Sequence, residues 1–191
     1  AMELHCGENK WSRKIRSQTT RLSGLMENLL ILARMDEQRP KLVREDLDFS
    51  ALVREHAEPF GEGAALKNAD FSISVEPGIH IHADREQMLQ IVTILLDNAV
   101  KYVNEDGHIA LSLRREGAGA VLQVRNSCAA LPDCPPEKLF DRFYRGDSAR
   151  TQKNGGYGIG LSVARAIVQA NGGTIRAAYN GENTIIFSVQ F

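Results

Sequence analysis

The sequence predicts an α/β domain, built from interspersed strands and helices and preceded by one long helix. Apolar residues recur every three or four positions in the first forty residues, then alternate with a period of two around residues 71–81. Two further pairs of alternating segments each flank a glycine-containing turn. With 191 residues, 43% of them hydrophobic, the chain is long enough for one sizeable core with an appendage.

The first expected element is a long amphipathic helix from Asn9 to Glu37. This range contains no proline and one glycine, and its apolar stripe is Ile15, Leu22, Met26, Leu29 and Ala33. The stripe is too rich to face water, so we expect a partner helix or the rest of the chain to cover it. The helix should end near Pro40, because proline disfavours helical geometry in the preceding residue.

A short linker should lead to a second helix from Ala51 to about Leu66, capped by Ser50 and kinked or divided at Pro59. Two short strands are expected next, near residues 71–75 and 79–82, on either side of the turn at Pro77-Gly78.

A third helix should run from Asp84 through Lys101 or Tyr102. Asp84 followed by Gln87 is close to a capping box and indicates where the helix begins. The helix is apolar on nearly every side, so Asn98 stands out as a polar residue in a segment that should be buried.

The second half of the chain should contain two hairpins separated by a long irregular segment. Strands near 108–115 and 120–125 form the first hairpin, and strands near 174–179 and 184–190 form the second. Residues 126–156 have the composition of a lid or binding loop, with a short helix expected from Glu137 to Tyr144. A final helix should follow GYGIGL and end at Asn171-Gly172-Gly173.

Composition excludes several classes of function. The net charge is −1 and like charges form no block, so neither nucleic acid nor an anionic membrane surface is an expected partner. No run approaches the roughly 18 apolar residues that a membrane-spanning helix needs, and we expect a soluble, cytoplasmic segment. The three cysteines lack CxxC spacing, which predicts neither a disulfide framework nor a zinc knuckle. Ala1 before Met2 is typical of a tag-cleavage scar, so we expect a fragment of a longer protein.

The glycine-rich run GGYGIGL at residues 155–161 opens a helix, where free backbone N–H groups meet phosphate well. It lacks the terminal Lys-Ser/Thr of a P-loop, and no strand precedes it as in a Rossmann motif. The run alone therefore leaves open that these glycines serve only a tight turn.

Three separated motifs change this interpretation: LLDNAVKY at 95–102, LFDRFYRGDSAR at 139–150 and GGYGIGLSVARAIVQANGGTI at 155–175. Their order and spacing resemble the catalytic ATP-binding domain of bacterial sensor histidine kinases. Residues 18–37 look like the second helix of that family's dimerisation and phosphotransfer hairpin. The resemblance implies a two-layer α/β sandwich of the Bergerat type, with a mixed sheet packed on helices. It divides the chain into a hairpin helix, 1–40, and a catalytic domain, 41–191.

Carried over position by position, the resemblance implies ATP and Mg²⁺ as cofactors. Asn98 would ligate the magnesium ion, Lys101 would contact a phosphate and Tyr102 would lie beside the nucleotide. One amide oxygen is an adequate anchor, because magnesium keeps waters and phosphate oxygens as its other ligands. The plainer alternative for Asn98 is a core amide satisfied by backbone groups.

The resemblance also implies a mobile lid. Arg142 or Arg145 would swing toward the terminal phosphate and offset charge during phosphoryl transfer, although each could be a solvated surface charge. The lid hinge would be the packed aromatic residues Phe140, Phe143 and Tyr144. Residues expected close to the nucleotide are Gly156, Gly158 and Gly160 at the phosphates and Leu161 beneath it.

Two departures from the family pattern affect the expected chemistry. NSCAALP at 126–132 replaces a common Asp-x-Gly-x-Gly-Ile-Pro string, so Asn126 takes the place of the adenine-reading aspartate, and Cys128 and Ala130 replace glycines. Loss of the charge-assisted hydrogen bond should weaken ATP binding by about 1 kcal/mol. Ile94 stands where related ATP hydrolases carry a glutamate, which disfavours transfer to water and favours a protein acceptor.

The phosphorylated histidine itself is absent. The family carries it in a string like His-Glu-x-x-x-Pro-Leu, which surrounds none of the five histidines here. The resemblance therefore implies that the intact protein is a homodimer that phosphorylates a histidine outside this sequence and passes the phosphoryl group to a response-regulator aspartate. Contact with a membrane is expected only through regions outside this segment. His80 and His82 could be considered a metal pair with Asp84, but Asp84 is better explained as a helix cap.

Two other functions stay open at this point. The altered residues 126–130 are compatible with a degenerate kinase domain that acts as a docking scaffold with weak or no ATP binding. The second alternative is a serine kinase or ATPase of the same fold, which Ile94 and the helix at 18–37 disfavour.

Overall fold

The computed structural model describes residues 9–36, 42–117, 119–145 and 157–191. Its helices are α2 (Lys10–Asp36), α3 (Phe49–Ala57), α4 (Phe60–Ala65), α5 (Arg85–Tyr102), the 3-10 helix η1 (Pro136–Phe140) and α7 (Gly160–Ala170). Its strands are β1 (Arg44–Asp48), β2 (Asp70–Val75), β3 (His80–Asp84), β4 (His108–Glu116), β5 (Gly119–Ser127), β6 (Thr174–Asn180) and β7 (Thr184–Gln190).

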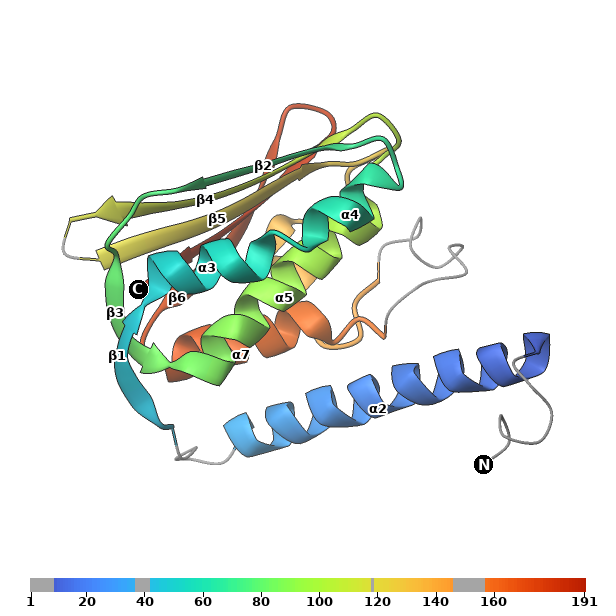
Figure 1. Ribbon diagram of the computed structural model, residues 1–191, viewed down its shortest axis with the longest axis horizontal. Helices are drawn as coiled ribbons and strands as arrows, with labels where there is room; N and C mark the ends of the chain where they lie inside the picture. The colour runs from blue at the N-terminus through green and yellow to red at the C-terminus, as the bar shows by residue number, and fades with distance from the viewer. Residues whose placement is uncertain (1–8, 37–41, 118, 146–156) are drawn as a thin grey trace.

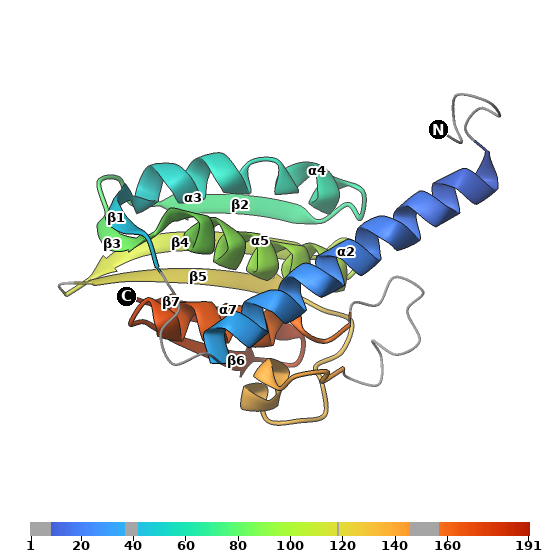
Figure 2. The same cartoon turned by 90° about the horizontal axis from the view of Figure 1, so that it is seen from below.

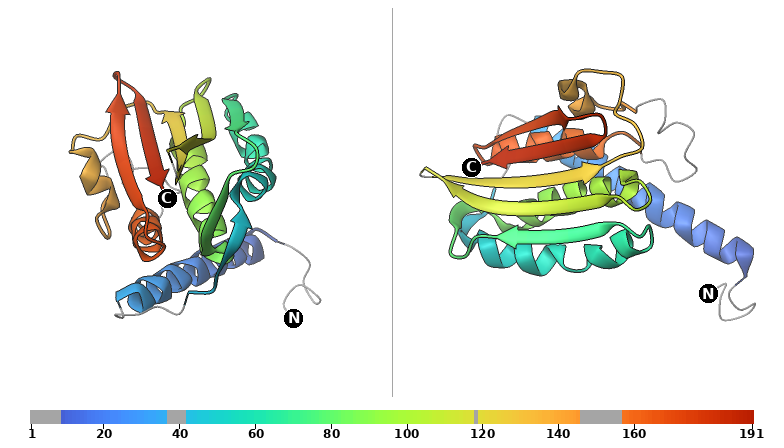
Figure 3. Two further views of the ribbon diagram at one scale, coloured as in Figure 1. Left: turned by 90° about the vertical axis from the view of Figure 1, so that its left-hand side faces the viewer. Right: turned by 90° about the horizontal axis from the view of Figure 1, so that it is seen from above.

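The main sheet has the strand order β2-β4-β5-β7-β6, in which β2 and β4 are parallel and the other neighbours are antiparallel. Helices α3, α5 and α7 cover one face of this sheet (Figure 1; Figure 3), which confirms the two-layer sandwich with a mixed sheet. Helix α2 lies outside the sandwich and contacts α7 (Figure 2). No helix in the described ranges is long and apolar enough to cross a bilayer.

The two predicted hairpins are confirmed, and one strand escaped prediction. Strands β4 and β5 pair antiparallel, as do β6 and β7. Strand β3 leaves the main sheet and pairs with β1 in a separate two-stranded ladder. Every residue of β1 except Leu47 is charged, and only Leu47 is buried, so no period-two pattern marked this strand.

The predicted cap at Ser50 is wrong. The carboxylate of Asp48 caps α3 by accepting a hydrogen bond from the backbone N–H of Ala51 at 2.9 Å. Ser50 lies inside the first turn and is buried. Its hydroxyl donates to the carbonyl of Glu76 at 2.6 Å and accepts from the N–H of Ile79 at 2.9 Å.

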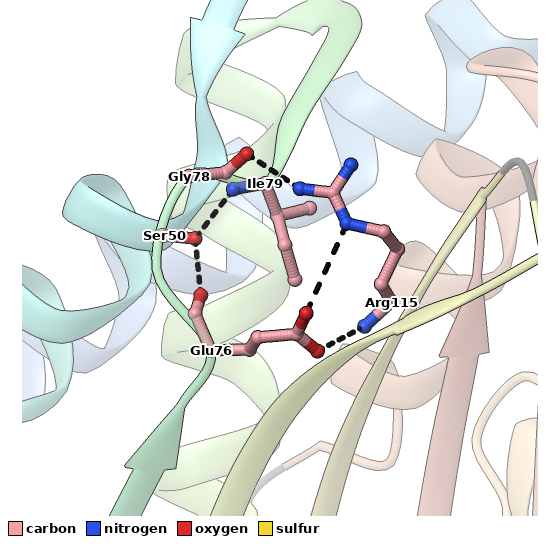
Figure 4. A network of polar contacts seen from close by, with 5 residues as sticks. All are labelled: Ser50, Glu76, Gly78, Ile79 and Arg115. Atoms are coloured by element: carbon pink, nitrogen blue, oxygen red, sulfur yellow. Dashed lines mark hydrogen bonds and ion pairs between the residues drawn. The ribbon is translucent and has the colours of Figure 1, made fainter.

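Ser50 thus belongs to a network that fixes the turn between β2 and β3 (Figure 4). Arg115 on β4 completes it: its backbone N–H donates to Glu76 Oε2 and its guanidinium to the carbonyl of Gly78, both at 2.8 Å. The turn is therefore held by α3 on one side and by the sheet on the other, which sends β3 toward β1.

Helix α5 begins as predicted and forms the centre of the helical layer. Asp84 Oδ1 accepts from the N–H of Gln87 at 3.1 Å, which confirms the cap. Gln87 does not complete the capping box; its Oε1 instead accepts from Asn171 Nδ2 at 2.6 Å and joins the start of α5 to the end of α7. The buried face of α5 consists of Met88, Ile91, Val92, Leu95, Leu96 and Ala99.

Two other predicted helix boundaries are also confirmed. Pro59 divides the second predicted helix into α3 and α4. Helix α7 ends at Asn171, followed by Gly172 with φ of +84°.

Candidate functional site

The described parts of the three motifs lie toward the end of the molecule where α5 and β5 end and α7 begins (Figure 1; Figure 3). Ile94 lies one helical turn before Asn98, and a Cβ atom on Gly160 would lie 3.5 Å from Ile94 Cγ2. The glycine that opens α7 is therefore in direct reach of the helix that carries Asn98. The start of α7 therefore packs against α5 one helical turn before Asn98.

Asn98, Lys101 and Tyr102 occupy the last turns of α5 and are all half-buried. Lys101 Nζ lies 4.8 Å from the centroid of the Tyr102 ring. Within the described ranges, the Asn98 side chain has no protein hydrogen-bond partner, so the alternative of a satisfied core amide is not supported. Its carbonyl oxygen remains available to an external ligand.

Two structural features require a glycine at position 158. Its φ is +72°, a left-handed conformation that residues with a Cβ rarely adopt. A Cβ atom there would also lie 2.5 Å from the carbonyl oxygen of Tyr144 and 2.9 Å from the carbonyl carbon of Phe143. The Phe143 N–H donates to the Gly158 carbonyl at 2.8 Å, so the aromatic segment and the glycine turn are joined backbone to backbone. Gly156 lies outside the described residues.

The predicted helix from Glu137 to Tyr144 is wrong in its extent. The segment forms the 3-10 helix η1, which ends at Phe140, and Phe143 has a φ of +63° that no helix accommodates. Phe140 is buried and packs edge-on against Phe187, with ring centroids 6.1 Å apart. Phe143 is 65% exposed, so the expectation that it packs into the hinge is also wrong.

The two lid arginines lie on either side of Phe143 and Tyr144. Arg142 is exposed and Arg145 is half-buried. The Phe143–Gly158 hydrogen bond holds the backbone of this segment beside the residues that precede α7. Leu161 is partly buried against the core in the first turn of α7.

Asn126, near the end of β5, carries a buried polar atom without a protein partner. The residue is 1% exposed, and its Nδ2 donates to the carbonyl of Ser127 at 2.8 Å. Its Oδ1 has no hydrogen-bond partner. The amide has only one sensible orientation, because reversing it would bring Oδ1 against the Ser127 carbonyl. Leaving such an acceptor unsatisfied costs about 1–3 kcal/mol, so the Asn126 oxygen calls for a donor from outside the protein, which a ligand or a water can supply.

The loop after α5 connects Asn126 to the Asn98 end of the site. Ser127 Oγ accepts from the N–H of His108 at 2.9 Å, and Ile109 is the register partner of Asn126 on β4. Only residues 103–107 separate this contact from the end of α5. The buried acceptor of Asn126 therefore lies on the strand that borders the loop following α5, the helix that carries the half-buried Asn98.

A comparison with known proteins decides the family. Residues 83–191 match the family of histidine kinase-, DNA gyrase B-, and HSP90-like ATPases, and this range contains α5, Asn126 and the glycine turn. The chain belongs to this ATPase family.

Full-length relatives narrow the assignment within the family. The chain is 31% identical over 189 residues to the sensor protein DltS of Streptococcus agalactiae, covering 99% of this chain and 47% of the relative. The catalytic domain of the histidine kinase ThkA superposes with a TM-score of 0.67 at 27% identity, over 78% of this chain and 95% of that one. ThkA in complex with the response regulator protein TrrA gives a TM-score of 0.73 at 22% identity, over 96% of this chain and 50% of that one. The chain contains the catalytic ATP-binding domain of a two-component sensor histidine kinase, and it spans less than half the length of the curated relatives it matches.

Next to Asn126, the chain departs from the expected histidine kinase pattern at Cys128 and Ala130. Cys128, which replaces a glycine, is 6% exposed, and burial raises the pKa of its thiol. Both its backbone N–H, at 2.7 Å, and its Sγ, at 3.3 Å, lie within hydrogen-bonding distance of the Asn183 carbonyl. The cysteine thus ties the end of β5 to the turn before β7. Ala130 is exposed.

The residues of this histidine kinase domain fit the ligand that the family binds. A buried acceptor at Asn126 suits the amino group of adenine, and the amide oxygen of Asn98 is a hard donor of the kind magnesium prefers. Sequence reasoning gave no role to Lys67, whose ammonium contacts the end of α5; no motif marks a lysine in a turn.

Proposed function

We propose that residues 42–191 bind ATP with Mg²⁺ and direct its terminal phosphoryl group to a histidine of the intact protein that lies outside this sequence. The observation that carries the proposal is the buried, unpartnered Oδ1 of Asn126, at the same end of the domain as Asn98 and Gly158. An acceptor there would pair with the adenine amino group, which donates.

The phosphate side of the site would use three groups of this chain. The Asn98 oxygen would hold magnesium, which would supply positive charge against the phosphates. Lys101 would contact a phosphate, and the start of α7 would present backbone N–H groups and the positive end of the helix dipole. Gly158 and Gly160 would let the phosphates approach the backbone, with Leu161 below the nucleotide.

Tyr102 would lie beside the nucleotide, while Arg142 or Arg145 would reach the terminal phosphate from the lid. A guanidinium in that position would stabilise the charge that spreads over the transferred oxygens. Both arginines follow η1 closely and are tied to the glycine turn through the backbone of Phe143.

Transfer to water is disfavoured by the surroundings of Asn98. Ile94 lies against Gly160 and offers no atom that could take a proton from water. The chain should therefore release inorganic phosphate slowly and depend on an acceptor side chain brought by another part of the protein.

The acceptor histidine and the regulator belong to the intact protein. None of the five histidines of the sequence has the surroundings of the family's phosphoacceptor, so we expect no stable phosphohistidine on this chain alone. Labelled ATP that produced an acid-labile phosphoprotein from this chain would contradict that expectation. Relay to a response-regulator aspartate is proposed because ThkA, a structural relative, was solved with its response regulator TrrA.

Residues 1–40 would contribute the second helix of a dimerisation hairpin, and 41–191 the catalytic domain. Helix α2 exposes a row of large apolar side chains, which supports pairing in the intact protein. The exposed members of the row are Trp11, Ile15, Leu22, Met26 and Leu30. Light scattering that gives a monomer at every concentration tested would count against pairing through this row.

Calorimetric titration with ATP in the presence and absence of Mg²⁺ tests the proposed function. Wild-type protein should bind ATP more tightly with magnesium, and Asn98→Ala should lose most of that magnesium-dependent gain. The matched control is Asn180→Ala, an exposed asparagine at the end of β6, which should bind as wild type does. Binding that ignores both magnesium and Asn98 would overturn the assignment of the metal ligand.

A docking scaffold is the second candidate, and Cys128 favours it. Its side chain stands where the family pattern has a glycine and hydrogen-bonds to the Asn183 carbonyl, so the backbone here would be less able to approach a nucleotide closely. The same titration separates the two functions, since absent or millimolar ATP binding supports a scaffold.

A further inference from the structure

Lys67 makes a concentrated set of contacts at the end of α5. Its ammonium donates to the carbonyl oxygens of Val100 at 2.9 Å, Lys101 at 2.8 Å and Val103 at 3.1 Å. These three bonds use every donor that a lysine ammonium has. Lys67 itself lies in the turn after α4, and its carbonyl accepts from the N–H of Asp106 at 3.1 Å, in the loop after α5.

The contacts satisfy backbone groups that the helix cannot satisfy by itself. The last carbonyls of an α-helix lack partners in the helix, and they form the negative end of its dipole. In α5 the Ala99 carbonyl accepts from the Val103 N–H at 2.9 Å. The carbonyls of Val100 and Lys101 instead accept hydrogen bonds from the Lys67 ammonium. A single cation thus neutralises the helix end and bonds to it directly.

The turn that Lys67 holds is the turn that carries candidate nucleotide ligands. Lys101 is both a phosphate-contacting candidate through its side chain and an anchor for Lys67 through its carbonyl. Tyr102 follows it, and the Lys101 ammonium lies 4.8 Å from the Tyr102 ring. Asn98 lies one turn earlier, next to the fully buried Ala99.

The burial of Lys67 indicates a specific role. Desolvation lowers the pKa of its ammonium, so placing the charge here has a cost that an ordinary surface lysine does not bear. A neutral donor or an α-helical C-cap glycine would satisfy carbonyls without that cost.

We propose that Lys67 is a positioning residue of the nucleotide site: by binding the Val100, Lys101 and Val103 carbonyls it fixes the last turn of α5, so that Lys101 and Tyr102 meet the nucleotide in one arrangement. The inference rests on the proposed function, since it assumes that these two side chains contact ATP. Lys67 itself touches neither phosphate nor base.

The test combines ATP–Mg²⁺ titration with hydrogen exchange on the whole chain. Lys67→Met should weaken ATP affinity about tenfold, because the last turn frays and Lys101 loses its position. Lys67→Arg keeps the charge and several donors, and should recover at least half of that loss. Lys14→Met, at an exposed site on α2, removes the same charge and should leave ATP affinity unchanged.

A double-mutant cycle distinguishes positioning from general destabilisation. In a Lys101→Ala background, Lys67→Met should cost less than about threefold in affinity, because the ligand that Lys67 positions is already missing. A merely structural lysine would give the same loss in both backgrounds, and that result would overturn the proposal. If Lys67→Met does not fold, Lys67→Gln, which removes the charge but keeps a donor, takes its place in the cycle.

Hydrogen exchange without nucleotide keeps the two proposals separable. Amides at the end of α5, including Val103, should exchange faster in Lys67→Met than in wild type. Faster exchange with unchanged ATP affinity would overturn the positioning role alone. Absence of ATP binding in wild type would overturn the proposed function and, with it, the positioning role, whatever the exchange shows.

Discussion

The two sides of the candidate nucleotide site are built differently. On the proposed phosphate side, Gly158, the start of α7 and Asn98 match the expected histidine kinase pattern, and the start of α7 packs against α5 through Gly160 and Ile94. On the base side, Asn126 and Cys128 replace an aspartate and a glycine, and Cys128 is bonded to the neighbouring turn. The phosphate side depends on backbone shape, whereas the base side depends on side-chain chemistry.

This difference teaches which changes such a site tolerates. We call the backbone at residues 158–160, before and at the start of α7, the cradle. It tolerates no added side-chain atom at Gly158, where backbone atoms of Phe143 and Tyr144 lie against the glycine. A base-reading side chain contributes on the order of 1 kcal/mol and can be exchanged at moderate cost. Phosphates carry most of the charge of ATP, so a site that keeps the glycine turn but has an altered base side should bind ATP at reduced affinity.

The largest expected effect comes from breaking the cradle. Gly158→Ala would place a Cβ 2.5 Å from the Tyr144 carbonyl oxygen at a φ of +72°, so the glycine turn and the Phe143 segment must separate. We expect a loss of about 1–3 kcal/mol in the free energy of unfolding, measured in urea. ATP affinity should fall at least about tenfold, measured by calorimetry.

Gly172→Ala is the matched control for this variant. Gly172 also has a positive φ, +84°, but a Cβ there would meet no atom within 4 Å and lies at the far end of α7. It should cost only the backbone strain, about 1 kcal/mol, and leave ATP affinity unchanged. Equal effects of the two variants on ATP binding would mean that the cradle does not touch the phosphates.

The second effect comes from restoring the family's side chain on the base side. Asn126→Asp removes the donor to the Ser127 carbonyl and brings a carboxylate oxygen against it. The variant should therefore lose about 1–3 kcal/mol of folding stability at neutral pH. A charge-assisted bond to adenine should meanwhile improve ATP affinity up to about tenfold.

In Asn126→Asp, folding stability should fall while ATP affinity rises. Few variants of a residue with only a structural role would show this combination. Asn126→Ala is the companion variant, and it should weaken ATP binding by about tenfold or less, since it removes the acceptor. Should Asn126→Asp and Asn126→Ala both leave ATP affinity at the wild-type value, the base does not reach Asn126.

The sequence predicted the elements whose signals are local. The Asp84 cap, the division at Pro59 and both hairpins rest on a few neighbouring residues, and the structure confirms each. We predicted that the glycine turn lies near α5 from the order of the motifs and the family resemblance, not from a physical argument. Contacts such as that of Gly160 with Ile94 depend on how the helices pack, which periodicity does not specify.

Two of the errors share a cause, which is competition between two partners for the same residue. Ser50 has the chemistry of a helix cap, but Asp48 takes that role and leaves Ser50 to the Glu76–Ile79 turn. Phe143 is a large apolar residue of the kind that usually packs into a core. Its backbone N–H, however, donates to the Gly158 carbonyl, and its ring is exposed. In both places a tertiary contact outweighed a local preference.

A smaller effect concerns how closed the base side is. Because burial raises the pKa of the Cys128 thiol and leaves it 6% exposed, iodoacetamide should alkylate Cys128 at least about tenfold more slowly than Cys134 at neutral pH. Peptide mass mapping over time gives both rates in one sample, and 8 M urea should make them similar. Fast modification of Cys128 in the folded protein would show that the base side opens readily, and the contrast drawn above would weaken.

The smallest expected effect tests the charge beside the magnesium ligand. Asp97 is next to Asn98 and keeps contact with solvent, yet desolvation raises the pKa of its carboxyl and the charge of His56 only partly opposes this. A folded-state pKa above the unfolded value of 3.8 means that the ionised carboxylate costs stability at neutral pH, and that this cost disappears as pH falls through the folded pKa. Asp97→Asn should therefore raise the free energy of unfolding at pH 7 by less than about 1 kcal/mol, given its exposure, with a smaller gain near pH 4. Urea titrations at both pH values check this, with the exposed Glu105→Gln as the control that should change little at either. If Asp97→Asn raised the free energy of unfolding equally at both pH values, the gain would come from packing. The charge of Asp97 would then have no effect on the stability of this part of the domain.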